Sequence, residues 1–162
     1  MKKAAFFDRD GTVIIDKGYL YNIEDIEFIE GVPELIKFYN ENNYLVIIIT
    51  NQSGIARGMF TIYEMEKVHE EINRLLKLKY NAHIDAFYYC PHHPLITGEC
   101  ECRKPSSGML NDAIRDFGLD VSQSILFGDK ESDIKCGENI GVASYYIQSV
   151  LGLVERSQWD IT

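Results

Sequence analysis

The sequence predicts an α/β fold in which helices cover both faces of a doubly wound, mainly parallel sheet. Aliphatic runs that suit buried strands alternate along the chain with amphipathic segments that suit helices. The run from Leu45 to Ile49 is apolar at every position, as in strands covered on both faces. Polar residues directly follow three of the runs, at Asp8 and Asp10, Thr50 and Asn51, and Asp129 and Lys130. We expect these groups to meet at the carboxyl edge of one sheet.

The expected strands are spread over the whole chain and are separated by helices. They cover residues 3–8, 44–49, 84–89, 124–127 and 141–147. The first helix opens at Pro33, which suits a first helical turn, and ends at residues 42–43. Thr61 and Glu64 form a capping-box pattern at the start of a helix that runs to about Tyr80.

Two further helices and two irregular segments complete the prediction. Ser106 or Ser107 is expected to cap a helix that Gly118 ends, and a short helix covers residues 132–139. Residues 11–29 have no periodicity and suit a flap over the site. The tail from Ser149 is expected at the periphery, with Trp159 packed on the surface.

Composition points to a soluble globular protein with one domain over residues 1–162. The chain has 46% hydrophobic residues, a mean hydropathy of -0.16 and a net charge of -9. It contains no apolar run of about 18 residues, and its start lacks the apolar length of a signal peptide. We therefore expect a cytoplasmic monomer with no membrane partner. The acidic balance argues against nucleic acid but permits a small anionic substrate.

The paired carboxylates of Asp8 and Asp10 are the strongest chemical signal. Aspartate is a common turn residue, but like charges this close favour a cation between them. Asp8 suits a nucleophile that forms an aspartyl-phosphate, and Asp10 suits a general acid–base. Mg²⁺ prefers oxygen ligands, which Asp8, Asp129 and Asp133 offer. Thr50, Asn51 and either Lys104 or Lys130 would stabilise charge on phosphoryl oxygens.

A second set of residues suits a structural zinc site in a loop over residues 90–103. Cys90, His92, Cys100 and Cys102 offer three thiolates and one imidazole. His93 is adjacent, so spacing alone leaves the histidine ligand open, and unliganded cysteines are the weaker alternative. Zinc would hold the neighbouring Arg103 and Lys104 at the rim of the site. The distant Cys136 is expected to be a small core residue.

Four motifs in this order resemble the haloacid dehalogenase superfamily of phosphatases. They are Asp8-x-Asp10-Gly11-Thr12, Thr50 after an aliphatic strand, Lys104 before a helix, and Gly128-Asp129-x-x-x-Asp133. They span nearly the whole chain, and the resemblance implies the Rossmann-like fold of that superfamily. The stretch between Gly54 and Lys104 has no room for a large cap domain. The resemblance therefore implies a capless enzyme with an open site.

Shorter stretches narrow the resemblance to the D-glycero-D-manno-heptose 1,7-bisphosphate 7-phosphatase family. These are Cys-Pro-His-His-Pro, Cys-x-Cys-Arg-Lys-Pro, Thr-Asn-Gln-Ser-Gly-Ile-Ala-Arg-Gly and Gly-Asp-Lys. The resemblance implies Mg²⁺-dependent removal of the C7 phosphate, with Asp8, Asp10, Thr50 and Lys104 as catalytic residues. It implies Mg²⁺ on Asp8, the Asp10 backbone and Asp129, and Zn²⁺ on Cys90, His92, Cys100 and Cys102. It further implies substrate contacts from Asp16, Lys17, Gly18, Tyr19, Asn51, Gln52, Ser53, Arg103 and Lys130.

Two alternatives remain open at this point. Histidinol-phosphate phosphatases share the first motif and the zinc loop, but they carry Asp where this chain has Ser53 and lack Asp16-x-Gly18-Tyr19. A non-catalytic zinc-loop binding module is the alternative from another class. Within the heptose family, the segment from His92 to Cys100 is shorter than in some members, which leaves the anomer open. The product could feed lipopolysaccharide, capsule or surface-layer glycan synthesis.

Three residues outside the motifs have simpler predictions. His69 and His83 are expected at the surface or on a helix face. Arg57 follows the Thr50 loop, and its charge could either reach an anion or be solvated.

Overall fold

The computed structural model describes residues 1–152 and contains one five-stranded sheet with the order β3-β2-β1-β4-β5. The strands are β1 (Lys3–Phe7), β2 (Tyr44–Asn51), β3 (Ala86–Cys90), β4 (Ile125–Gly128) and β5 (Ala143–Tyr146). All neighbouring strands pair in parallel. The chain moves outward from β1 to β3 and then returns to the other side of β1 for β4 and β5. This reversal confirms the doubly wound prediction and puts the topological switch point between β1 and β4.

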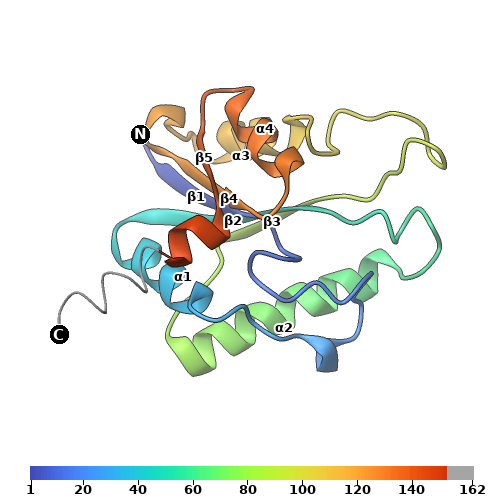
Figure 1. Ribbon diagram of the computed structural model, residues 1–162, viewed down its shortest axis with the longest axis horizontal. Coiled ribbons are helices and arrows are strands. Elements are labelled where there is room, and N and C mark those ends of the chain that lie inside the picture. The colour runs from blue at the N-terminus through green and yellow to red at the C-terminus, as the bar shows by residue number, and fades with distance from the viewer. Residues whose placement is uncertain (153–162) are drawn as a thin grey trace.

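Helices cover both faces of the sheet. They are α1 (Val32–Glu41), α2 (Ile62–Tyr80), α3 (Gly108–Phe117) and α4 (Glu131–Glu138), with 3-10 turns η1 (Ile23–Asp25) and η2 (Val121–Gln123). Figure 1 shows α1 and α2 on one side of the sheet and α3 and α4 on the other. The loop between β3 and α3 extends away from the sheet in this view.

The side chains of the central strands alternate between two cores. Phe7 and Ile48 pack with α1 and α2, while Phe6 and Ile47 pack with α3 and α4, and all four are fully buried. An unbroken aliphatic strand is what a sheet buried on both faces requires. The prediction from the run Leu45 to Ile49 is therefore confirmed.

Most helix ends follow the predicted local chemistry. Thr61 and Glu64 form the capping box, because Thr61 Oγ1 accepts from the Glu64 amide at 3.1 Å and the Thr61 amide donates to Glu64 Oε1 at 3.0 Å. Gly118 ends α3 in the left-handed conformation. The predicted serine cap of α3 is wrong in its chemistry. Ser107 stands at the N-cap, but its hydroxyl donates to Cys136 O at 2.8 Å and makes no cap hydrogen bond.

The segments around the sheet bear on access to the site. Within residues 1–152, the chain from β2 to β3 forms α2 and no separate cap domain, which agrees with a capless fold. Residues 147–152 are helical, and Val150 and Leu151 pack against the core beside α1. The prediction of a peripheral tail is therefore wrong for these two residues, and Trp159 lies outside the described residues.

No helix in the described part of the chain has the length and apolarity to cross a membrane.

Candidate active site

Three carboxylates gather at the switch point of the sheet. Asp8 follows β1, and its amide donates to Phe127 O of β4 at 3.0 Å. Asp129 follows β4, and Asp133 lies in the first turn of α4. Oxygens of the three side chains lie within 4.8 Å of one another. Parallel pairing of β1 with β4 thus brings Asp8 and Asp129 together from opposite ends of the sequence.

Lys104 is the cation inside this carboxylate cluster. Its Nζ lies 2.6 Å from Asp8 Oδ1 and 2.7 Å from Asp133 Oδ1, and it also donates to Ile49 O at 3.1 Å. Asn51 fixes the backbone of Lys104, because Oδ1 accepts from the Lys104 amide at 3.0 Å and Nδ2 donates to the Lys104 carbonyl at 3.4 Å. Asn51 was predicted to contact substrate. In the structure its amide group holds the lysine that pairs with Asp8.

Burial dominates the electrostatics of this pair. Removal of Asp8 from water raises the pKa of its carboxyl to about 8, because desolvation and the nearby Asp133 charge outweigh the attraction of Lys104. Burial alone would lower the pKa of Lys104, but the Asp8 and Asp133 carboxylates hold that pKa above its usual value. The lysine therefore stays charged. An additional cation is needed to keep all three neighbouring carboxylates ionised.

The residues present fit a Mg²⁺ ion. Among the described residues, Asp129 Oδ1 is buried and has no hydrogen-bond partner, which is costly unless a cation meets it. Gly11 packs so closely here that an added Cβ would collide with the Asp129 carboxylate. Asp133 is a poorer ligand for Mg²⁺, because its Oδ2 already accepts hydrogen bonds from the amides of Asp129 and Lys130, both at 3.1 Å. Asp8 and Asp129 are the side chains best placed to hold the ion.

Three donors hold the carboxylate of Asp10. Arg9 donates from Nε to Oδ2 at 3.0 Å and from Nη2 to Oδ1 at 3.1 Å, and Gln52 Nε2 donates to Oδ2 at 3.0 Å. Gln52 also donates to Thr50 Oγ1 at 2.7 Å. Gln52 was predicted to contact substrate, yet its amide nitrogen links Thr50 to Asp10 within the protein.

Arg9 and His69 are site residues that the sequence prediction missed. The Arg9 side chain is fully buried, and its Nη1 lies 3.2 Å from His69 Nε2 on α2. The prediction of a surface position for His69 is wrong, although the residue does lie on a helix face. Burial and the neighbouring Arg9 lower the pKa of His69 to about 3. No local signal marks either residue, because an arginine between two aspartates resembles an exposed turn charge.

A cavity of about 530 Å³ opens above the carboxylates. Most of the residues predicted to act on substrate line it: Asp8, Asp10, Asp16, Gly18, Tyr19, Asn51, Gln52, Ser53, Arg103, Lys104 and Lys130. Thr50, Lys17 and Asp129 do not line it. Arg57 does, and its guanidinium lies 5.6 Å from the centre of the Tyr19 ring, so it faces the cavity and not only bulk solvent.

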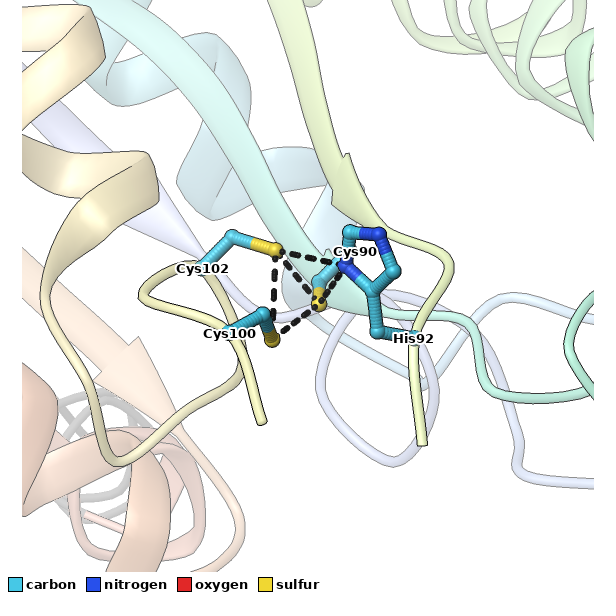
Figure 2. Close-up of side chains that lie close together, drawn as sticks. All are labelled: Cys90, His92, Cys100 and Cys102. Atoms are coloured by element: carbon cyan, nitrogen blue, oxygen red, sulfur yellow. Dashed lines mark hydrogen bonds between the residues drawn. The ribbon is translucent and has the colours of Figure 1, made fainter. Parts of the chain in front are cut away.

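The four predicted zinc ligands lie together, as Figure 2 shows. Cys102 Sγ lies 2.7 Å from Cys90 Sγ, 3.6 Å from Cys100 Sγ and 3.3 Å from His92 Nδ1. Sulfurs of a tetrahedral zinc site lie about 3.8 Å apart, close to the 3.6 Å that separates Cys100 Sγ from both Cys90 Sγ and Cys102 Sγ, whereas Cys90 and Cys102 lie closer together. The donor set therefore fits Zn²⁺.

The neighbouring histidines have different surroundings. His92 Nδ1 points into the cysteine cluster, whereas His93 Nδ1 accepts from the Leu95 amide at 3.2 Å within its own turn. The geometry thus favours His92, a choice that spacing left open. Cys136 lies apart in the core, where its thiol donates to Ser106 O at 3.3 Å.

Comparisons with known proteins agree with this site. The chain matches the family model for polynucleotide kinase 3 phosphatase over residues 3–146. A relative from Haemophilus ducreyi, named D-glycero-beta-D-manno-heptose-1,7-bisphosphate 7-phosphatase, is 45% identical over 145 residues, which cover 87% of this chain and 80% of the relative. A Campylobacter jejuni relative named for the alpha anomer is 44% identical over 142 residues, covering 88% of this chain and 80% of the relative.

A solved structure extends the comparison to the fold and its ligands. D,D-heptose 1,7-bisphosphate phosphatase from B. bronchiseptica, complexed with magnesium and phosphate, superposes with a TM-score of 0.82. It is 28% identical in sequence, and the match covers 93% of this chain and 86% of that one. Together with the shared motifs and the carboxylate cluster at the switch point, these matches show that the chain belongs to the heptose 1,7-bisphosphate 7-phosphatase family of the haloacid dehalogenase superfamily.

Proposed function

We propose that this protein is a Mg²⁺-dependent phosphatase that removes the C7 phosphate of D-glycero-D-manno-heptose 1,7-bisphosphate. The observation that carries the proposal is the buried group of Asp8, Lys104 and Asp129 beneath an open polar cavity. The names of the relatives from Haemophilus ducreyi and Campylobacter jejuni support the substrate. The magnesium and phosphate in the B. bronchiseptica complex support the metal and the reaction class.

Asp8 and Asp10 divide the chemistry. Asp8 attacks phosphorus and forms an aspartyl-phosphate, while Asp10 gives a proton to the departing sugar oxygen. Asp10 then takes a proton from the water that hydrolyses the aspartyl-phosphate. Lys104 neutralises charge on the phosphoryl group beside Asp8. Thr50, at the end of β2, helps to stabilise the same charge. Mg²⁺, held by Asp8, the Asp10 backbone and Asp129, supplies positive charge that offsets the phosphoryl oxygens.

The outer cavity suits the sugar and the phosphate that remains on it. Arg57, Arg103 and Lys130 line the cavity and offer three cations for a second phosphate. The loop from Asp16 to Tyr19 forms another part of the wall, and Asp16 Oδ1 accepts from the Gly18 amide at 2.9 Å to fix its turn. Ser53 completes the proposed sugar contacts, while the side chains of Asn51 and Gln52 hold Lys104, Asp10 and Thr50 in place.

Zinc has a structural role in this proposal. Cys90 ends β3, and the loop that follows it returns through Cys102 directly to Arg103 and Lys104. Arg103 Nη1 also donates to His92 O at 3.4 Å, which ties the cavity wall to the cluster. Zinc bound to the four ligands would therefore set the positions of two cations at the site. Thiolates that hold zinc need a reducing compartment, which supports a cytoplasmic location.

The experiment that tests the proposal measures both the phosphate lost and the residue responsible. Purified protein with Mg²⁺ is incubated with the α and β anomers of heptose 1,7-bisphosphate and with histidinol phosphate, and ³¹P NMR follows each phosphate. We expect loss of the C7 phosphate and none after Asp8→Asn. Asp112→Asn, which changes an exposed aspartate of α3, is the matched control. Phosphate release by Asp8→Asn at the wild-type rate, or preference for histidinol phosphate, would contradict the proposal.

A further inference from the structure

Arg9 lies between the active site and α2 and contacts both. Its guanidinium binds both oxygens of Asp10 on one side. Its other contacts are His69 Nε2 at 3.2 Å and the Leu20 carbonyl, which Nη2 reaches at 3.4 Å. A fully buried arginine needs partners for its donors, and these three residues supply them.

The geometry fixes the protonation state and the orientation of His69. A guanidinium can only donate hydrogen bonds, so His69 Nε2 must accept, and the ring is neutral with its proton on Nδ1. The ring stacks on Phe87 of β3 with a centroid distance of 4.4 Å and an interplanar angle of 10°. The imidazole is therefore held from two sides, by the Arg9 guanidinium and by the Phe87 ring.

His69 also separates Arg9 from a second cavity. A cavity of about 390 Å³ on the far side of the imidazole is lined by His69 and Phe87, together with residues of α2 and β3. Arg9 is fully buried and does not line this cavity. Without the imidazole, the Arg9 guanidinium would lose its contact with His69 Nε2. It could then move toward the second cavity.

We propose that His69 is a positioning residue for the general acid–base, because it fixes the Arg9 guanidinium that in turn fixes the carboxylate of Asp10. The inference rests on the proposed function, in which Asp10 protonates the leaving oxygen. His69 lies sixty positions from Arg9 in sequence and does not line the cavity above Asp8 and Asp10. Its effect reaches the reaction only through the orientation of the guanidinium.

Two variants of His69 separate hydrogen bonding from packing. His69→Phe keeps an aromatic ring that can stack on Phe87 but offers no acceptor to Arg9. His69→Gln offers an amide oxygen at about the reach of Nε2, so it restores the acceptor while it removes the aromatic ring. A purely structural role for His69 would make the glutamine variant at least as defective as the phenylalanine variant.

Substrates with different leaving groups supply the kinetic test. The leaving group of 4-nitrophenyl phosphate departs without a proton, whereas an alkyl phosphate such as the heptose bisphosphate needs one. We expect His69→Phe to lower kcat/KM for the alkyl substrate about tenfold, a part of what general acid catalysis contributes, and to leave the aryl substrate within about twofold. His69→Gln should recover most of the loss. Equal losses on both substrates, or no recovery with glutamine, would overturn the proposal.

A measurement without turnover keeps this inference separate from the proposed function. In ¹⁵N-resolved NMR spectra, the Nε–H signal of Arg9, identified by its loss in Arg9→Lys, should exchange slowly with solvent. We expect faster exchange in His69→Phe and slow exchange in His69→Gln. If the wild type hydrolyses no phosphomonoester, the proposed function fails. If the Arg9 Nε–H exchanges with solvent as slowly in His69→Phe as in the wild type, the inference that His69 fixes Arg9 is overturned.

Discussion

Lys104 Nζ and Asp8 Oδ1 form a 2.6 Å ion pair in the buried floor of the cavity, although the two residues are 96 positions apart in sequence. The same ammonium also pairs with Asp133. Asp8, the proposed nucleophile, therefore already has a cation beside it before any substrate binds. A charge that is already in place stabilises a phosphoryl group efficiently. Lys104 and its carboxylate partners are already removed from water, so little reorganisation is needed when the substrate binds.

Lys104→Met should abolish most of the activity. The change keeps a long side chain but removes the charge beside Asp8, and loss of a preorganised donor in an active site costs about 10²–10³-fold in kcat. It also leaves the Asp133 carboxylate buried without its cation, which we expect to lower the free energy of unfolding by about 3–5 kcal/mol. Steady-state kinetics and urea unfolding measure the two effects.

Lys135→Met is the matched control, because Lys135 on α4 is exposed and, within residues 1–152, forms its one ion pair with Glu131. It should retain the wild-type rate and stability to within about 1 kcal/mol. A Lys104→Met enzyme with near-wild-type kcat would show that the ion pair with Asp8 does not serve catalysis.

Gly11→Ala should weaken Mg²⁺ binding. Gly11 has φ of +87°, and a Cβ there would collide with the Asp129 carboxylate, so the chain or the carboxylate must shift. Isothermal titration with Mg²⁺ should show a large rise in Kd, with activity lost in parallel at low metal concentration.

Gly118→Ala controls for backbone strain. Gly118 also has a positive φ, of +62°, but no atom of the residues that the structure describes lies within 4 Å of the position a Cβ would take. Both substitutions should cost stability of about 1 kcal/mol through the backbone, yet only Gly11→Ala should change Mg²⁺ affinity. Equal Mg²⁺ affinity in the two variants would argue against Asp129 as a ligand.

The two adjacent histidines give a sharp test of the zinc site. His92→Ala should bind zinc less than the wild type, because it removes the nitrogen that points into the cysteine cluster, while His93→Ala should retain about one zinc per chain. Metal analysis after dialysis against a chelator measures the content. We also expect His92→Ala to lose activity, since the loop carries Arg103 and Lys104 into the cavity. Full zinc content in His92→Ala would refute this ligand set.

Local patterns were enough to predict much of the fold and the Cys/His cluster that could hold zinc. The aliphatic run Leu45 to Ile49, the Thr61 and Glu64 capping box, and the spacing of the cysteines each reflect physics that acts within a few residues. The acidic strand ends also follow this logic, because a parallel sheet gathers its carboxyl ends at one edge.

The remaining part of the site depends on contacts that no short pattern encodes. Arg9 resembles an exposed charge in sequence, and one of the partners that its burial requires, His69, comes from α2, sixty positions away. Gln52 and Asn51 look like substrate donors at a strand end. In the structure, the Gln52 amide is bound to Asp10 and Thr50, and the Asn51 amide to the backbone of Lys104. Which partner a polar side chain chooses is settled by the packing of distant elements.

Burial of a neutral His69 should make the protein less stable in mild acid. The folded protein keeps the ring unprotonated down to a pKa of about 3, whereas the unfolded chain takes up a proton below about pH 6.5. Protons therefore favour the unfolded state between these values, so stability is complete above pH 6.5 and falls as the pH is lowered. From pH 7 to pH 5 the loss from this one residue is about 2 kcal/mol. His69→Gln removes the titrating group, and its free energy of unfolding should fall less over this range by that amount. The matched control is His83→Gln, which makes the same substitution at a half-exposed histidine away from Arg9. Urea unfolding at the two pH values measures all three proteins, and equal pH dependence in wild type and His69→Gln would mean that His69 becomes protonated within the fold.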